Sequence, residues 1–131
     1  GYIVAAVGEA GGEVPYTSYI AKRSWLDANE DVAKGFLRAL LRGVQYAQTQ
    51  DTAVIAEHLV SHFPSTSAQS LATSVTSYRN IDAWVTDMAM TQASFERLQD
   101  IIESAGELDR RADFNALVDN SYVKEVYAQL S

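Results

Sequence analysis

The spacing of the apolar residues changes once along the chain, near Asn29, and this change limits the folds that the chain can adopt. Beyond Asn29 the apolar residues recur every three or four positions, which is the period of an amphipathic α-helix. Side chains that can cap a helix precede these stretches. Helices are therefore predicted from Asn29 to about Gln48, from Asp51 to Pro64, from Ser65 or Ser67 through Tyr78, from Thr91 to Gly106 and through Leu130, with a short turn opened by Asp113.

The first 25 residues have no helical spacing and resemble β-strands instead. The apolar run 2–7 is short and ends at Gly8, as a buried strand would. The run 16–21 mixes β-branched and aromatic residues in near alternation, which predicts a second strand. Glycines and Pro15 make the connection irregular. Because the chain opens in mid-strand without an initiator Met, we expect it to be a piece of a longer protein.

Composition excludes several classes of function. The 131 residues carry a formal net charge of −7, and a sequence pI near 4.6 argues against binding to nucleic acid or to anionic lipid. The absence of cysteine excludes disulfides and thiolate catalysis. No nucleophile elbow or phosphate-binding glycine loop is present, so we predict a protein that is not an enzyme and has no cofactor.

Two groups of charged or titratable residues have a simple interpretation. His58 and His62 are one helical turn apart and could face one metal ion, but no third ligand is indicated, so no metal site is predicted. Lys34, Arg38 and Arg42 form a stripe spaced by four, which we interpret as a solvated face of the first long helix. A salt-bridge surface for another domain or a partner is the alternative.

The best candidate for a binding site is the segment 8–17, which joins the two predicted strands. Its glycines allow a ligand to approach the backbone, and its polar and aromatic side chains could hold an amine-bearing ring. The candidate ligand-binding residues are Glu9, Gly12, Glu13, Tyr16 and Thr17. The carboxylates favour a cationic or amine-bearing solute over sulfonate or nitrate. An ordinary turn between strands remains the alternative.

Several ordered motifs resemble a known family. They are GEVPYT (12–17), AKRSW (21–25), NEDVAKGF (29–36), YRNIDAW (78–84), SFERLQDII (94–102), AGEL (105–108) and LVDNSY (117–122). In this order they resemble the second half of a solute-binding protein of an ABC importer. The most similar type is the branch related to thiamine-pyrimidine, nitrate, sulfonate and taurine binding proteins. The resemblance covers nearly the whole chain.

The resemblance implies a fold and a role. It implies an α/β, two-lobed, type II periplasmic-binding-protein-like fold, of which this chain would be a partial and mainly α-helical piece with one or two N-terminal strands. Residues 1–12 would end the second lobe and begin the hinge crossing, and residues 13–131 would form the C-terminal part of the first lobe. The solute would be a thiamine-precursor-like heteroaromatic, delivered to a membrane permease.

The resemblance also bears on location and assembly. The protein would be exported, and either periplasmic or lipid-anchored at the cell surface (a lipoprotein), with its anchor outside this chain. The N-terminal half of the family is missing here, so dimerisation or strand exchange would cover apolar surface left exposed. One alternative is a self-contained helical protein-interaction domain without a small-molecule ligand. A pyrimidine-synthesis enzyme with the same binding fold is a weaker alternative, since such relatives use Cys motifs.

Overall fold

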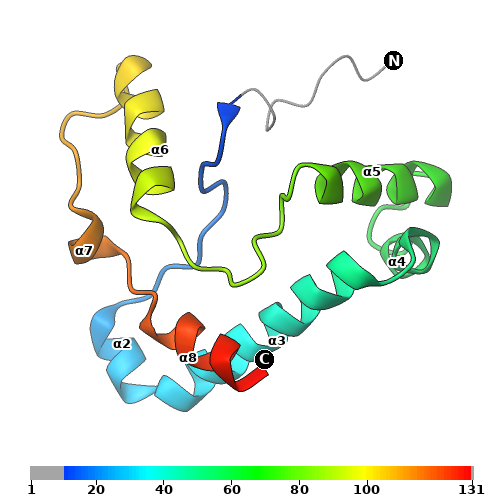
Figure 1. The fold of residues 1–131 in the computed structure, drawn as a ribbon, viewed down its shortest axis with the longest axis horizontal. Helices are drawn as coiled ribbons and strands as arrows, with labels where there is room; N and C mark the ends of the chain where they lie inside the picture. Colours follow the sequence, from blue (N-terminus) through cyan, green and yellow to red (C-terminus); the bar gives the residue numbers. More distant parts are fainter. Residues whose placement is uncertain (1–10, 131) are drawn as a thin grey trace. The chain divides into compact units, whose positions relative to one another are not determined.

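The computed structural model describes residues 11–130, and their regular structure is entirely helical (Figure 1). The helices are α2 (Arg23–Ala28), α3 (Glu30–Thr49), α4 (Thr52–Leu59), α5 (Ala68–Asn80), α6 (Gln92–Ser104), α7 (Phe114–Leu117) and α8 (Ser121–Leu130). They fall into two compact units. One contains Arg38–Met88, and the other contains the chain up to Leu37 together with Ala89 onward.

The predicted α/β fold is wrong for the described residues, because residues 11–130 contain no strand and no sheet. The predicted strand 2–7 lies outside the described residues. The predicted strand 16–21 is not paired with another strand, and two of its side chains, Tyr16 and Ile20, are 97% and 95% exposed. A strand needs a neighbouring strand to satisfy its backbone groups, and alternation in the sequence cannot supply one. The two-lobed assignment of residues 1–12 and 13–131 stays a prediction.

No helix was predicted before Trp25, but α2 already begins at Arg23. The carbonyl of Lys22 accepts hydrogen bonds from the N–H groups of Trp25 and Leu26, which closes the first turn. The segment contains no β-branched residue, glycine or proline that would oppose a helix. Its six residues are too few to show a helical period, which explains why the sequence pattern gave no signal.

Most predicted helix starts are confirmed. The side chains of Asp51, Ser67 and Thr91 accept hydrogen bonds from backbone N–H groups at the starts of α4, α5 and α6. Asp113 does the same for α7, where its carboxylate accepts from two N–H groups. Each of these side chains satisfies donors that the helix leaves without a partner. The predicted stop after α6 is also confirmed, since Gly106 has a φ of +75°.

In the unit Arg38–Met88, α4 packs against α5 through the buried side chains of Ile55, Ala56, Leu71 and Val75. Arg79, near the end of α5, donates to backbone carbonyls at the end of α3 and just beyond it. Along the outer side of α5, four hydroxyl side chains donate to the carbonyl four residues earlier. They are Thr73, Ser74, Thr76 and Ser77.

The other unit is held together by polar contacts to α8 and to the residues just before it. Lys34 of α3 forms ion pairs of 2.6 Å with Glu30 on its own helix and with Glu125 on α8. The Lys34 side chain is only 15% exposed, so the predicted solvated stripe does not hold at this residue. The amide of Asn120 both donates to the Met90 carbonyl (2.8 Å) and accepts from the Met90 N–H (3.1 Å).

Candidate ligand-binding site

The described part of the predicted binding segment, residues 11–17, lies beside α6, and two contacts connect it to this helix and to its N-cap residue (Figure 1). Gly12 has a φ of +71°, a left-handed conformation that favours glycine. A Cβ atom at this position would lie 1.9 Å from Nη1 of Arg97 on α6. The same Nη1 atom is 3.5 Å from the Gly11 carbonyl oxygen, to which it donates. Gly12 therefore lets the backbone turn where it meets the Arg97 guanidinium.

Glu13 places a carboxylate near the N-terminal end of α6. The hydroxyl of Thr91 donates to the Glu13 Oε1 atom over 3.4 Å, and the same hydroxyl caps α6 by accepting from the Ser94 N–H. The free N–H groups at the start of a helix favour a negative charge nearby. This contact joins two residues that are 78 positions apart in the sequence. The carboxylate itself is exposed and open to a ligand.

The remaining predicted site residues are less closely connected to α6. Tyr16 is 97% exposed, and Thr17 is also exposed. Tyr19, which the sequence did not suggest, has its ring 4.9 Å from the ring of Phe36, in an edge-to-face arrangement at 83°. Glu9 lies outside the described residues. The structure thus brings Gly12 and Glu13 to α6, and leaves Tyr16 and Thr17 exposed on the same extended segment.

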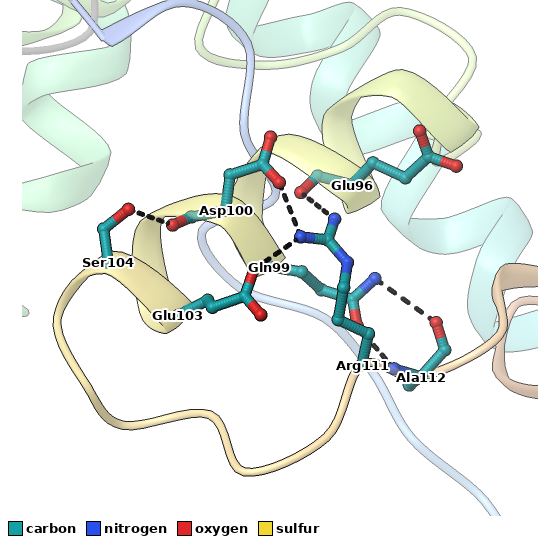
Figure 2. A network of polar contacts seen from close by, with 7 residues as sticks. All are labelled: Glu96, Gln99, Asp100, Glu103, Ser104, Arg111 and Ala112. Atoms are coloured by element: carbon teal, nitrogen blue, oxygen red, sulfur yellow. Dashed lines mark hydrogen bonds and ion pairs between the residues drawn. The ribbon is translucent and has the colours of Figure 1, made fainter.

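A second polar feature of α6 was not predicted: a hollow of about 190 Å³ between α6 and α7. It is lined by Gln92, Phe95, Glu96, Gln99, Arg111, Ala112, Asp113, Phe114 and Asn115. The amide of Gln99, which is 6% exposed, accepts from the Ala112 N–H (2.5 Å) and donates to the Ala112 carbonyl (3.3 Å). This pair of contacts holds the chain before α7 against α6 (Figure 2).

Arg111 forms the charged part of the same network (Figure 2). Its Nη1 atom donates to Asp100 at 2.6 Å and to Glu103 at 3.0 Å. These hydrogen bonds, that to Asp100 first, raise the pKa of Arg111. Its Nη2 atom donates to the backbone carbonyl of Glu96. Both Nη atoms of this guanidinium make contacts inside the chain, so Arg111 helps to position the loop between α6 and α7.

Another ion pair links α2 to Asp119, which lies two residues before α8. Arg23 donates to Oδ2 of Asp119 over 2.5 Å, and the Ser121 hydroxyl and N–H donate to Oδ1. These contacts lower the pKa of Asp119 to about 2, with the Ser121 hydroxyl as the largest cause and Arg23 next. The carboxylate is therefore committed to holding α2 and α8 together.

The two histidines do not share a helix. Helix α4 ends at Leu59, so it includes His58 but not His62, whose N–H donates to the Leu59 carbonyl in a tighter turn. Across residues 11–130, no three His, Asp or Glu side chains are grouped so that they could hold a metal ion. In the same range, no helix is both long and apolar enough to cross a bilayer.

Comparison with known proteins supports a binding role for this chain. A Bacillus subtilis (strain 168) protein named "Putative binding protein YtlA" is 32% identical over 129 residues, which is 98% of this chain and 39% of that protein. The chain thus spans about two-fifths of the length of the curated relative that it matches. No family model matches the chain, and no solved structure matches it.

Proposed function

We propose that this chain is a non-enzymatic part of a solute-binding protein that serves an ABC importer. The protein would be exported, capture a small amine-bearing heteroaromatic solute outside the membrane, and deliver it to a permease. The name of the B. subtilis relative supports a binding role. The ordered motifs that resemble importer binding proteins support the more specific assignment.

One structural observation carries the choice of solute. Glu13, an exposed carboxylate near the start of α6, lies three positions before Tyr16, whose ring is 97% exposed. A carboxylate pairs with an ammonium or amino group, and an aromatic ring offers a surface for stacking on a heteroaromatic ring. A positively charged ring would gain from both groups.

Isothermal titration calorimetry on the full-length protein tests this proposal. The probes are an aminopyrimidine, its N-alkylated cation, taurine and nitrate. We expect binding of the first two only. Glu13→Gln should weaken binding about tenfold, because a hydrogen bond to a charged group contributes roughly 1.5–3 kcal/mol. Tyr16→Ala should weaken binding about fivefold, whereas Tyr16→Phe should retain it because the ring is kept.

The matched control is Glu107→Gln, which removes an exposed carboxylate beyond the end of α6 in the same unit. It should leave the dissociation constant unchanged. An equal loss in Glu13→Gln and Glu107→Gln would mean that only overall charge matters, and would overturn the assignment of Glu13. Absence of heat with both ring compounds would overturn the proposed solute class.

The alternative function, a self-contained helical interaction domain, makes a different prediction. Such a domain would be monomeric and would leave little apolar surface exposed. Tyr16 and Ile20, each at least 95% exposed, do not fit that expectation. Dye binding and light scattering on the 131-residue chain distinguish the two: a monomer that binds no dye favours the interaction domain.

A further inference from the structure

Arg97 of α6 brings a positive charge to the same extended segment that carries Glu13 and Tyr16. Its Nη1 atom is 3.5 Å from the Gly11 carbonyl oxygen, and a Cβ atom added at Gly12 would lie 1.9 Å from it. Any side chain at position 12 would displace the guanidinium, so glycine keeps this place open for it. The guanidinium therefore lies against the backbone of residues 11–12, immediately before the residue that carries the carboxylate.

The positive charge of Arg97 has no counterion among residues 11–130. Arg23 and Arg111, by contrast, each form an ion pair with at least one carboxylate. The hydrogen bond from Arg97 to Gly11, at 3.5 Å, is longer than is usual for an N–H donor and uses a single nitrogen. A guanidinium has several N–H donors arranged in a planar fork. Because the Arg97 side chain is also exposed, most of these donors are available to a ligand.

Glu13 carries the opposite charge and is equally available. Its one contact within the described part of the chain is the Thr91 hydroxyl, at 3.4 Å. Glu13 and Arg97 form no ion pair with one another. Yet they meet the segment at positions 13 and 11, whose Cα atoms are at most about 7 Å apart. The segment thus presents a cation and an anion, not paired with each other, within reach of one small molecule.

We infer that Arg97 is a specificity-determining residue of the proposed site, and that the solute carries a carboxylate opposite its amino group. This inference rests on the proposed function. The amino group donates to Glu13, and the carboxylate accepts two parallel hydrogen bonds from the Arg97 guanidinium, the arrangement for which an arginine fork is suited. Substituents at opposite positions of a ring keep the solute carboxylate away from the Glu13 carboxylate.

The charges at the site favour a carboxylate over other anionic groups. A carboxylate matches the single positive charge of Arg97, whereas a phosphate group with two negative charges would be repelled more strongly by Glu13. Taurine has an amine and an anionic group but no ring. It therefore lacks the surface that stacks on Tyr16, and it is still expected not to bind.

Isothermal titration calorimetry on the full-length protein tests the inference with two probes that differ in charge. One is an aminopyrimidine with a carboxylate opposite its amino group, and the other is the matching carboxamide. We expect the parent protein to bind the carboxylate about tenfold more tightly, because hydrogen bonds between charged groups are the stronger ones. Arg97→Gln should remove this preference and leave the dissociation constant of the carboxamide unchanged, since glutamine can still donate to a carbonyl oxygen.

Two further variants separate specificity from a merely structural role. Arg110→Gln removes an exposed positive charge from the loop between α6 and α7 in the same unit, and is the matched control that should keep the full preference. Arg97→Lys keeps the charge but not the fork, so it should retain a preference of about threefold, and it replaces Arg97→Gln if circular dichroism shows that variant to be unfolded. An equal loss of preference in Arg97→Gln and Arg110→Gln would overturn the inference. Equal weakening of both probes by Arg97→Gln would overturn it too, because Arg97 would then only hold the segment in place.

The same two probes distinguish failure of this inference from failure of the proposed function. If the carboxamide binds and the carboxylate binds no more tightly, the role of Arg97 is refuted while the proposed solute class stands. If neither probe binds, the proposed function is refuted and the inference with it.

Discussion

Replacing Asn120 by alanine should destabilise the unit that contains α6 and α8. The Asn120 amide makes two hydrogen bonds, of 2.8 and 3.1 Å, to the backbone of Met90, just before α6 begins. It is partly buried, so water replaces these contacts only in part. A net 0.5–1.5 kcal/mol for each bond gives a loss of about 2 kcal/mol in the free energy of unfolding.

A second substitution at Asn120 tests its two hydrogen bonds separately. Asn120→Asp keeps an acceptor for the Met90 N–H but removes the donor to the Met90 carbonyl and sets a negative charge against that oxygen. We expect it to be at least as destabilising as the alanine variant. The matched control is Asn115→Ala, an exposed asparagine on α7, which should change the free energy by less than about 0.5 kcal/mol.

Urea unfolding followed by tryptophan fluorescence measures these differences. Trp25 belongs to the unit with α6 and α8, and Trp84 belongs to the other unit. In a Trp84→Phe background, fluorescence therefore reports the unit that Asn120 stabilises, and circular dichroism reports both. The reasoning would be refuted if Asn120→Ala cost no more than Asn115→Ala, or if Asn120→Asp were as stable as the parent.

Three further outcomes are expected. Ser121 and Arg23 lower the folded pKa of Asp119 to about 2, so the Asp119 carboxylate should stabilise the fold by about 1–2 kcal/mol above about pH 4. This stabilisation should be lost as the pH falls towards 2. The difference in unfolding free energy between the parent and Asp119→Asn, measured from pH 2 to 7, checks this. Gly43→Ala, inside α3 with open space around the added methyl, should raise the free energy of unfolding by about 0.5–1 kcal/mol in urea titrations. Gly106→Ala should lower it by about 1 kcal/mol, because φ is +75° there, and a gain in stability would contradict the left-handed geometry.

Local signals in the sequence account for the helices that were predicted correctly. A cap such as Thr91 acts within three residues, and Gly106 ends α6 through its own backbone conformation, so neighbouring residues decide the outcome. Local signals do not determine in the same way which side chains are buried by packing. The helical period places Tyr78 on the side of α5 that carries Leu71 and Val75, yet Tyr78 is 52% exposed and stacks on Trp84 with ring centroids 5.5 Å apart. The helical period places a residue on a face but does not say what covers that face.

In the candidate site too, the sequence indicated some residues but not the contacts that those residues make. The sequence indicated Gly12 and Glu13 by their residue types, but nothing in it connects Glu13 to Thr91, 78 positions away. The amide of Gln99 was missed for a similar reason, since its partner is the backbone of Ala112, whose side chain carries no polar group to signal it. Strand character at residues 16–21 failed because strand pairing depends on a distant neighbour, and within residues 11–130 no strand supplies one.

The hydroxyl side chains along α5 affect the free-energy cost of removing water from this helix. Thr73, Ser74, Thr76 and Ser77 already donate their protons to the helix's own carbonyls, so they need few hydrogen bonds from solvent. Helix α3, by contrast, carries five formal charges, each of which loses strong hydration when water is removed. Helix α5 can therefore be dehydrated at a much lower cost than α3.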